Sequence, residues 1–198
     1  GNVGEQVHFG RVFGAAGDAL SAFGALEPAT LTAPGYGPPV LHLADWNLVL
    51  WAYPNDPELP GLRALADPVL AQATFAAEHE RFELPEPPAA TEARTLKYVA
   101  GKRCGTLFTV SFASGAPPRQ IYGKAYRSGQ GQGAYEIQRM VWESTVRKLG
   151  GYYAPKPYAY DGPNGIVWQE ALRGRPIAKD PDERARLAET AHEIGARL

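Results

Sequence analysis

The chain has 198 residues, of which 44% are hydrophobic, enough to bury one sizeable core or two small ones. Its 20 basic and 21 acidic side chains leave a formal net charge of −1, which lacks the positive excess that general nucleic-acid or anionic-membrane binding needs. One cysteine, Cys104, excludes an internal disulfide and a cysteine-based zinc site, and the four histidines lack metal-ligand spacing. We therefore expect a soluble, cytoplasmic protein with no metal site, nucleic-acid partner or membrane partner.

The first 57 residues predict loops, one strand and a turn. Residues 1–39 are rich in glycine, alanine and proline and carry little periodicity, so we expect mainly loops there. Residues 40–53 place leucines and tryptophans in partial alternation, which predicts a strand that ends at the turn formers of residues 54–57. Since an isolated hairpin is only marginally stable, this strand should join a small sheet of its own or pack on the following region.

The next segment predicts helix and then a linker. From Glu58 to Phe82 apolar residues recur at spacings of three and four, which predicts one or two helices interrupted at Pro68. Prolines at positions 85, 87 and 88 close the segment, a composition typical of an extended linker. We therefore interpret residues 1–90 as a small N-terminal α+β region to which the pattern assigns no particular fold.

Strand patterns dominate the region that follows. Three of them occupy residues 95–99, 106–112 and 119–126. The links between them are short and rich in glycine or proline, which favours antiparallel neighbours in a meander. The first half of this region therefore predicts three strands of one antiparallel sheet.

One helix and two more strands complete the predicted sheet. Apolar residues of 134–149 lie near one side of a helix, and Gly150-Gly151 supplies a stop. Strands are predicted at 156–160 and 165–171, joined by turn formers. We expect residues 95–171 to form one antiparallel sheet of about five strands with the helix packed on one face. A last helix is predicted from Asp180, where Pro181 suits a first turn.

The order of these elements is the layout of a kinase-type N-terminal lobe, with Lys124 at the end of the third strand and Glu136 in the helix. On four stretches in the expected order, residues 95–198 resemble the aminoglycoside phosphotransferase and choline-kinase-like superfamily. The four stretches are Lys97 to Cys104, Ile121 to Arg127, Ala154 to Tyr160 and Trp168 to Pro176. The resemblance implies an α+β chain whose residues 91–178 form the lobe with its hinge, preceded by 1–90 and followed at 179–198 by the start of a truncated C-terminal lobe.

The resemblance implies a nucleotide site around Lys124. Its ammonium would hold the α- and β-phosphates of ATP, and the Glu136 carboxylate would orient it. The two groups should then lie within about 4 Å, or about 8 Å if the helix is rotated outward. Glu143 competes with Glu136 for this role. The alternative is that Lys124 is a solvated strand lysine and Glu136 a surface residue of the helix.

Glycines and a hinge complete the implied site. In the resembled family the loop over the phosphates joins the first two strands, which makes Gly101 and Gly105 the candidates here. The Glu170 carbonyl and the Ala171 amide would contact adenine in the hinge. The alternatives are an exposed hairpin tip and an ordinary edge strand that ends in a turn.

The family's catalytic Asp, Asn and metal-binding Asp lie in a C-terminal lobe, and residues 183–198 resemble the helix just before them. We therefore expect no catalytic residue and no metal ligand in this chain. The resemblance implies the nucleotide-binding part of a phosphotransferase that uses ATP (or GTP) with Mg²⁺ and a small-molecule acceptor, and that is inactive alone. The alternative is a non-catalytic kinase-like regulatory or protein-binding module. A reading frame extended past Leu198 would discriminate between them.

Overall fold

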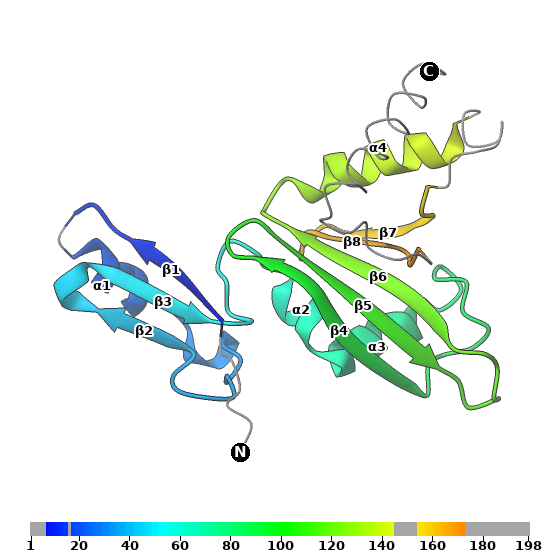
Figure 1. Cartoon of the computed structure of the whole chain (residues 1–198), viewed down its shortest axis with the longest axis horizontal. Helices are drawn as coiled ribbons and strands as arrows, with labels where there is room; N and C mark the ends of the chain where they lie inside the picture. Colours follow the sequence, from blue (N-terminus) through cyan, green and yellow to red (C-terminus); the bar gives the residue numbers. More distant parts are fainter. Residues whose placement is uncertain (1–6, 16, 145–153, 173–198) are drawn as a thin grey trace, which may run out of the picture.

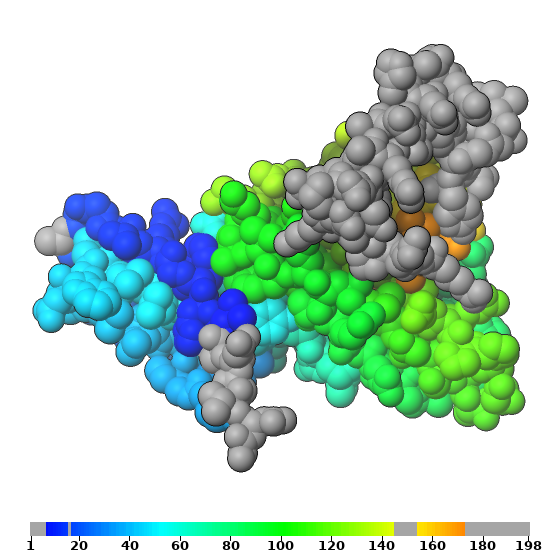
Figure 2. Space-filling model, viewed as in Figure 1, coloured from blue at the N-terminus to red at the C-terminus, as the bar shows by residue number. Residues whose placement is uncertain are grey.

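The computed structural model describes residues 7–15, 17–144 and 154–172, which form two antiparallel sheets (Figure 1). A three-stranded sheet contains the N-terminal residues, and a five-stranded sheet contains most of the rest. In the space-filling view the blue N-terminal residues lie directly against the green strands of the larger sheet (Figure 2). None of the helices in the described residues combines the length and apolar character that crossing a bilayer requires.

The small sheet has the order β1-β3-β2, from β1 (His8–Val12), β2 (Val40–Leu43) and β3 (Leu48–Ala52). Helix α1 (Asp18–Gly24) packs on it, and Trp51 belongs to its core. The expected strand over 40–53 is thus a hairpin, and the prediction of a small sheet of its own is confirmed. Its turn works because Asn47 adopts a left-handed φ of 47° and donates from Nδ2 to the Phe13 and Ala15 carbonyls, both at 2.6 Å.

The expectation of loops over residues 1–39 is wrong in part, since that range holds β1, α1 and a short 3-10 turn (Pro28–Thr30). Four of the five residues of β1 are exposed, so the strand carries no apolar alternation by which sequence reading could detect it. Tertiary pairing with β3 creates this strand. The local sequence contributes little to it.

The large sheet confirms the predicted five antiparallel strands. They are β4 (Ala90–Val99), β5 (Arg103–Ser111), β6 (Arg119–Tyr126), β7 (Pro157–Asp161) and β8 (Ile166–Glu170). Their spatial order is β4-β5-β6-β8-β7, and every neighbouring pair is antiparallel. The last two strands therefore enter the sheet in reverse order, with β8 beside the central β6.

Two helices, α2 (Leu62–Ala66) and α3 (Pro68–Ala77), cover one face of the large sheet. The ring of Phe75 on α3 lies 5.5 Å from that of Phe108 and 5.2 Å from that of Trp168, centroid to centroid. The helices and the sheet thus share one core. The sequence-based division at residue 90 separates α2 and α3 from the sheet, whereas the structure joins them in one core. Helices this short bury their apolar side chains only against the sheet.

Helix α4 (Gly131–Glu143) packs on the other side of the large sheet, over β7 and β8 (Figure 1). Tyr135 stacks on Tyr160 of β7 with ring centroids 6.1 Å apart, and Gln138 donates to the Pro155 carbonyl at 3.1 Å. The helix predicted over 134–149 begins earlier than expected, at Gly131. Residues 145–149 of that prediction and the helix predicted from Asp180 lie outside the described residues.

Candidate functional site

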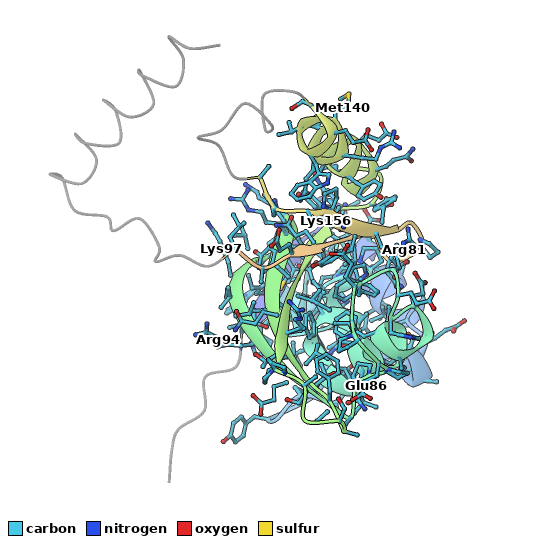
Figure 3. The ribbon with its side chains drawn as sticks, turned by 90° about the vertical axis from the view of Figure 1, so that its right-hand side faces the viewer. Arg81, Glu86, Arg94, Lys97, Met140 and Lys156 are labelled. Carbon is cyan, nitrogen blue, oxygen red and sulfur yellow. The ribbon has the colours of Figure 1, made fainter. Side chains whose placement is uncertain are left out.

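A row of directly opposed residues crosses the large sheet on the side away from α2 and α3, here called the outer face. Lys97 of β4 lies opposite Gly105 of β5, which lies opposite Lys124 of β6. Opposed residues of antiparallel strands project to the same face, so the two lysines flank the glycine. Figure 3 shows Arg94 and Lys97 projecting from the sheet on the side opposite α3.

A cavity of about 200 Å³ occupies this part of the outer face. Its lining residues are Lys97, Arg103, Cys104, Gly105, Tyr122 and Lys124. Three of them are cations and none is a carboxylate, although the whole chain has a net charge of −1. The cavity is therefore a local concentration of positive charge with room for an anionic group.

The phenol ring of Tyr122 extends over Gly105 in this cavity. A Cβ at position 105 would lie 1.9 Å from the Tyr122 hydroxyl, so only glycine allows this approach. Burial raises the pKa of Tyr122 above its ordinary value of 10.0, and the hydroxyl stays protonated at neutral pH. It can then donate a hydrogen bond to an anion beside the cations.

The Lys124 ammonium lies 4.5 Å from the centroid of the Tyr126 ring, a cation–π contact. Within the described residues no carboxylate forms an ion pair with it. A contact of this kind contributes about 0.5–1 kcal/mol at an exposed site, less than a charge-assisted bond to phosphate. Lys124 is thus a cation that an anionic ligand can recruit.

The β4–β5 hairpin tip is held from behind by a buried carboxylate. Gly101, with φ of 66°, donates its N–H to Asp56 Oδ2 at 2.6 Å. The Tyr98 hydroxyl donates to the same oxygen at 2.8 Å. The amide of Gly101, a candidate for the loop over the phosphates, therefore has an internal acceptor, because the loop after β3 reaches the hairpin.

A second cavity, of about 600 Å³, adjoins the hairpin tip. It is lined by Val99, Gly101, Lys102, Arg103, Tyr126, Arg127 and Gln130. Arg103 lines both cavities, so the two cavities are neighbours on the outer face. The positive charge of the outer face therefore continues from Lys124 to the end of the hairpin.

The expected ion pair between Lys124 and Glu136 is absent from the described residues. The Glu136 carboxylate accepts from Gln132 Nε2 at 2.9 Å, within its own helix. Helix α4 turns Tyr135 and Gln138 towards the sheet, and the period of 3.6 residues then directs Glu136 away from it. Glu143 does not replace it, since it pairs with Arg139 at 3.9 Å. The expected ion pair within about 4 Å is therefore wrong, and the approach within about 8 Å expected for a helix rotated outward stays a prediction.

Glu170 and Ala171 lie at the end of β8, where the Glu170 N–H donates to the Lys156 carbonyl at 2.8 Å. At the usual rise of about 3.3 Å per residue, Glu170 is about 10 Å along the strand from Val167, which faces Lys124. Both of these residues, which the resemblance implies as the hinge, line a cavity of about 580 Å³ whose other lining residues include Arg119, Lys156 and Tyr158. The expected base end and phosphate end thus lie on one strand pair, a nucleoside's length apart.

Sequence reading did not single out Lys97, Tyr122 or Asp56. The first two are detectable in principle, because alternation along β6 places Tyr122 on the Lys124 face and the hairpin register brings Lys97 beside it. Asp56 carries no such signal. Its contacts span 42 and 45 residues, and its position between two prolines indicates only a turn.

The chain matches no protein-family model, and comparisons with curated proteins and with solved structures find no match. Across the described residues no group of three or more His, Cys, Asp or Glu is placed to hold a metal ion. The functional interpretation therefore depends on the geometry and chemistry of the outer face.

Proposed function

We propose that the chain is the N-terminal nucleotide-binding part of an ATP-dependent small-molecule phosphotransferase, similar to the aminoglycoside phosphotransferase and choline-kinase-like superfamily. In this proposal the five-stranded sheet is a kinase-like N-terminal lobe. Lys124 binds the nucleotide phosphates, Glu170 and Ala171 receive the base, and the acceptor and the residues of the transfer step belong to other parts of the protein.

The observation that carries the proposal is the Lys124 ammonium, which has no ion pair within the described residues and lies beside Gly105 in a cavity with two further cations. Nucleotide phosphates are multiply charged acceptors, and cations without a carboxylate partner bind them without first breaking an ion pair. Arg103 adds a planar fork that suits two phosphate oxygens, and Lys124 adds a point charge. Tyr122 supplies a neutral donor at the same place.

The strand order supplies further support. The order β4-β5-β6-β8-β7 puts the strand that bears Lys124 at the centre of the sheet, between the glycine hairpin and the strand that leads to Glu170. A nucleotide lying along β6 and β8 would therefore place its phosphates by Lys124 and its base by the hinge cavity. Both ends of such a ligand meet the group expected to recognise them.

The proposal assigns no metal ligand to this part of the chain. Mg²⁺ would accompany the nucleotide, and hard cations of this kind need several oxygen ligands. The described residues that line the cavity beside Lys124 include three cations and no carboxylate, so they do not fit the ion. Lys97, Arg103 and Lys124 neutralise phosphate charge directly instead.

One observation favours a second candidate, a non-catalytic kinase-like regulatory or protein-binding module. The Glu136 carboxylate bonds to Gln132, and in the part of the chain that the structure describes Lys124 lacks the oriented pair that phosphoryl transfer needs. A module of this kind could keep the sheet as a scaffold and bind nucleotide weakly or not at all.

Titration of the 198-residue chain with MgATP and MgGTP tests the proposal. We expect binding of at least one nucleotide, weakened about tenfold or more by Lys124→Ala, because a lost charge-assisted bond costs about 1.5–3 kcal/mol. The control is Arg63→Ala on α2, which removes one positive charge on the other side of the sheet and should change the dissociation constant less than about twofold. Absence of binding, or equal effects of the two variants, would contradict the proposal.

A further inference from the structure

We propose that Asp56 is a positioning residue that braces the β4–β5 hairpin and so sets the place of the cations that bind phosphate. The inference rests on the proposed nucleotide function and goes beyond it, because it assigns a role in binding to a loop outside the large sheet. Asp56 itself lines neither of the two cavities that Arg103 lines.

Asp56 is a buried carboxylate, only 4% exposed, and is satisfied by hydrogen bonds alone. Oδ2 accepts from the Gly101 N–H and the Tyr98 hydroxyl, and Oδ1 accepts from the Glu58 N–H at 3.0 Å. No described cation forms an ion pair with it. A buried charge is costly unless donors surround it, and two of these three donors belong to the hairpin. The hairpin and the carboxylate therefore hold each other in place.

The small sheet holds the hairpin tip from a second direction. A Cβ at Gly101 would lie 2.9 Å from the ring of Phe9 on β1, so the backbone of the tip packs closely on that ring. Phe9 in turn contacts Trp51 of the small-sheet core, with ring centroids 5.6 Å apart. The tip thus has no room to move towards the small sheet.

The same loop also fixes the far wall of the second cavity. Glu58, two residues after Asp56, pairs with Arg127 at 2.6 Å and with Arg11 at 3.6 Å. Arg127 follows the end of β6 directly and lines that cavity together with Gly101 and Arg103. Residues 56–58 therefore hold the hairpin tip and the end of the Lys124 strand at a fixed separation.

This arrangement has a chemical consequence for phosphate binding. Since Asp56 occupies the Gly101 N–H, an incoming phosphate meets the side chains of Arg103 and Lys124 rather than the tip amide. Arg103 follows Gly101 by two residues at the start of β5. If the hairpin tip were mobile, the Arg103 guanidinium would sample a wider range of positions. Cations fixed before binding lose less side-chain and backbone entropy when the ligand arrives.

Asp56→Asn is the sharpest test, because it keeps the shape of the side chain. An amide offers one acceptor oxygen, so either Glu58 or the pair Gly101 and Tyr98 would face an NH₂ group instead. The matched control is Tyr98→Phe, which removes a bond to the same oxygen but leaves the bond to the tip. Affinity for MgATP or MgGTP, hydrogen exchange of residues 99–103 and the free energy of unfolding are measured for all three proteins.

We expect Asp56→Asn to weaken nucleotide affinity about fivefold or more and to speed exchange at the tip, while Tyr98→Phe changes affinity less than twofold at a similar loss of stability. Should Asp56→Asn bind as tightly as the wild type, or should both variants lose affinity in proportion to stability, the inference is overturned. If Asp56→Asn does not fold, Phe9→Ala must loosen the tip and weaken binding, and an unchanged affinity there is equally decisive. A wild-type chain that binds neither nucleotide refutes the proposed function itself.

Discussion

Glycine at position 105 determines whether the Tyr122 side chain can lie beside Lys97 and Lys124 on the outer face. Its importance is the lack of a Cβ, because any larger residue would push the Tyr122 ring away from Lys124. The resemblance implies a glycine at this position for a different reason, a place in the loop over the nucleotide phosphates. Both reasons require the same small residue, so the sequence pattern alone does not separate them.

Tyr98 allows a prediction about alkaline pH. Burial, then the hydrogen bond and charge of Asp56, raises the pKa of the Tyr98 phenol above its ordinary value of 10.0. The folded chain then holds this proton more tightly than the unfolded chain, so the contribution to stability is complete below pH 10 and declines as pH rises above it. Wild type should therefore lose more unfolding free energy than Tyr98→Phe between about pH 9.5 and about pH 11.

Urea unfolding at several pH values measures this difference. Cys104, Tyr53 and Tyr122, whose pKa values burial also raises, are present in both proteins, so the difference between the two curves reports the Tyr98 proton and its coupling to Cys104 and Tyr53. Parallel curves for wild type and Tyr98→Phe over this interval would show that the Tyr98 proton is not linked to folding.

At the scale of elements, the predictable parts are those whose pattern is local. Strands β4, β5 and β6 were predictable because alternation and short turns lie within one stretch of chain. The face presented by α4 was not, because that choice depends on its contacts. Ile137 and Met140, which sequence reading grouped as one side of the helix, are 61% and 60% exposed, and Figure 3 shows Met140 on the outside.

The same limit explains why no ion pair joins Glu136 to Lys124 in the described residues. Its spacing from Lys124 was compatible with a helix folded back over the sheet, and α4 does fold back. The rotation of the helix about its axis is set by Tyr135 against Tyr160 and by Gln138 against Pro155, contacts between segments far apart in sequence. Spacing gives the element and its approximate place, and packing decides which side chain points inward.

Helix α3 carries a cap whose loss should be measurable. The Asp67 carboxylate accepts from the backbone N–H of Val69 at 2.8 Å and of Leu70 at 3.4 Å, and Pro68 occupies the first turn. Asp67→Ala should lower the free energy of unfolding by about 1 kcal/mol, and Asp67→Asn by less, since its amide oxygen still accepts. Chemical denaturation measures both. An equal loss in the two variants would show that charge, not capping, explains the effect.

At the scale of the whole molecule, the two faces of the large sheet have different tasks. Helices α2 and α3 bury one face, and this frees the other to carry charged and aromatic side chains such as Lys124 and Tyr122. The N-terminal region thus contributes the core of the sheet as well as the brace of the hairpin. Composition favours a domain boundary at the prolines of residues 85–88. Such a boundary would separate α2 and α3 from the sheet that they cover, and Asp56 from the hairpin that it contacts.

Phe75 tests this shared core. It is fully buried, and its ring contacts the rings of Phe82, Phe108 and Trp168, so it joins α3 to β5 and β8. Removing a buried aromatic side chain of this kind costs about 3–5 kcal/mol, so Phe75→Ala should lower the free energy of unfolding by about that amount. Far-UV circular dichroism and tryptophan fluorescence during denaturation measure the loss.

The control for Phe75→Ala is Phe23→Ala on α1, where the ring is 37% exposed and stacks on His42 of the small sheet. Because the Phe23 ring is partly solvated and lies outside the large-sheet core, its removal should cost clearly less, about 1 kcal/mol. If Phe75→Ala costs no more than Phe23→Ala, then α3 contributes little to the stability of the large sheet. The sheet would then stand without the N-terminal helices, and the division at residue 90 would describe the folding units better than the shared core does.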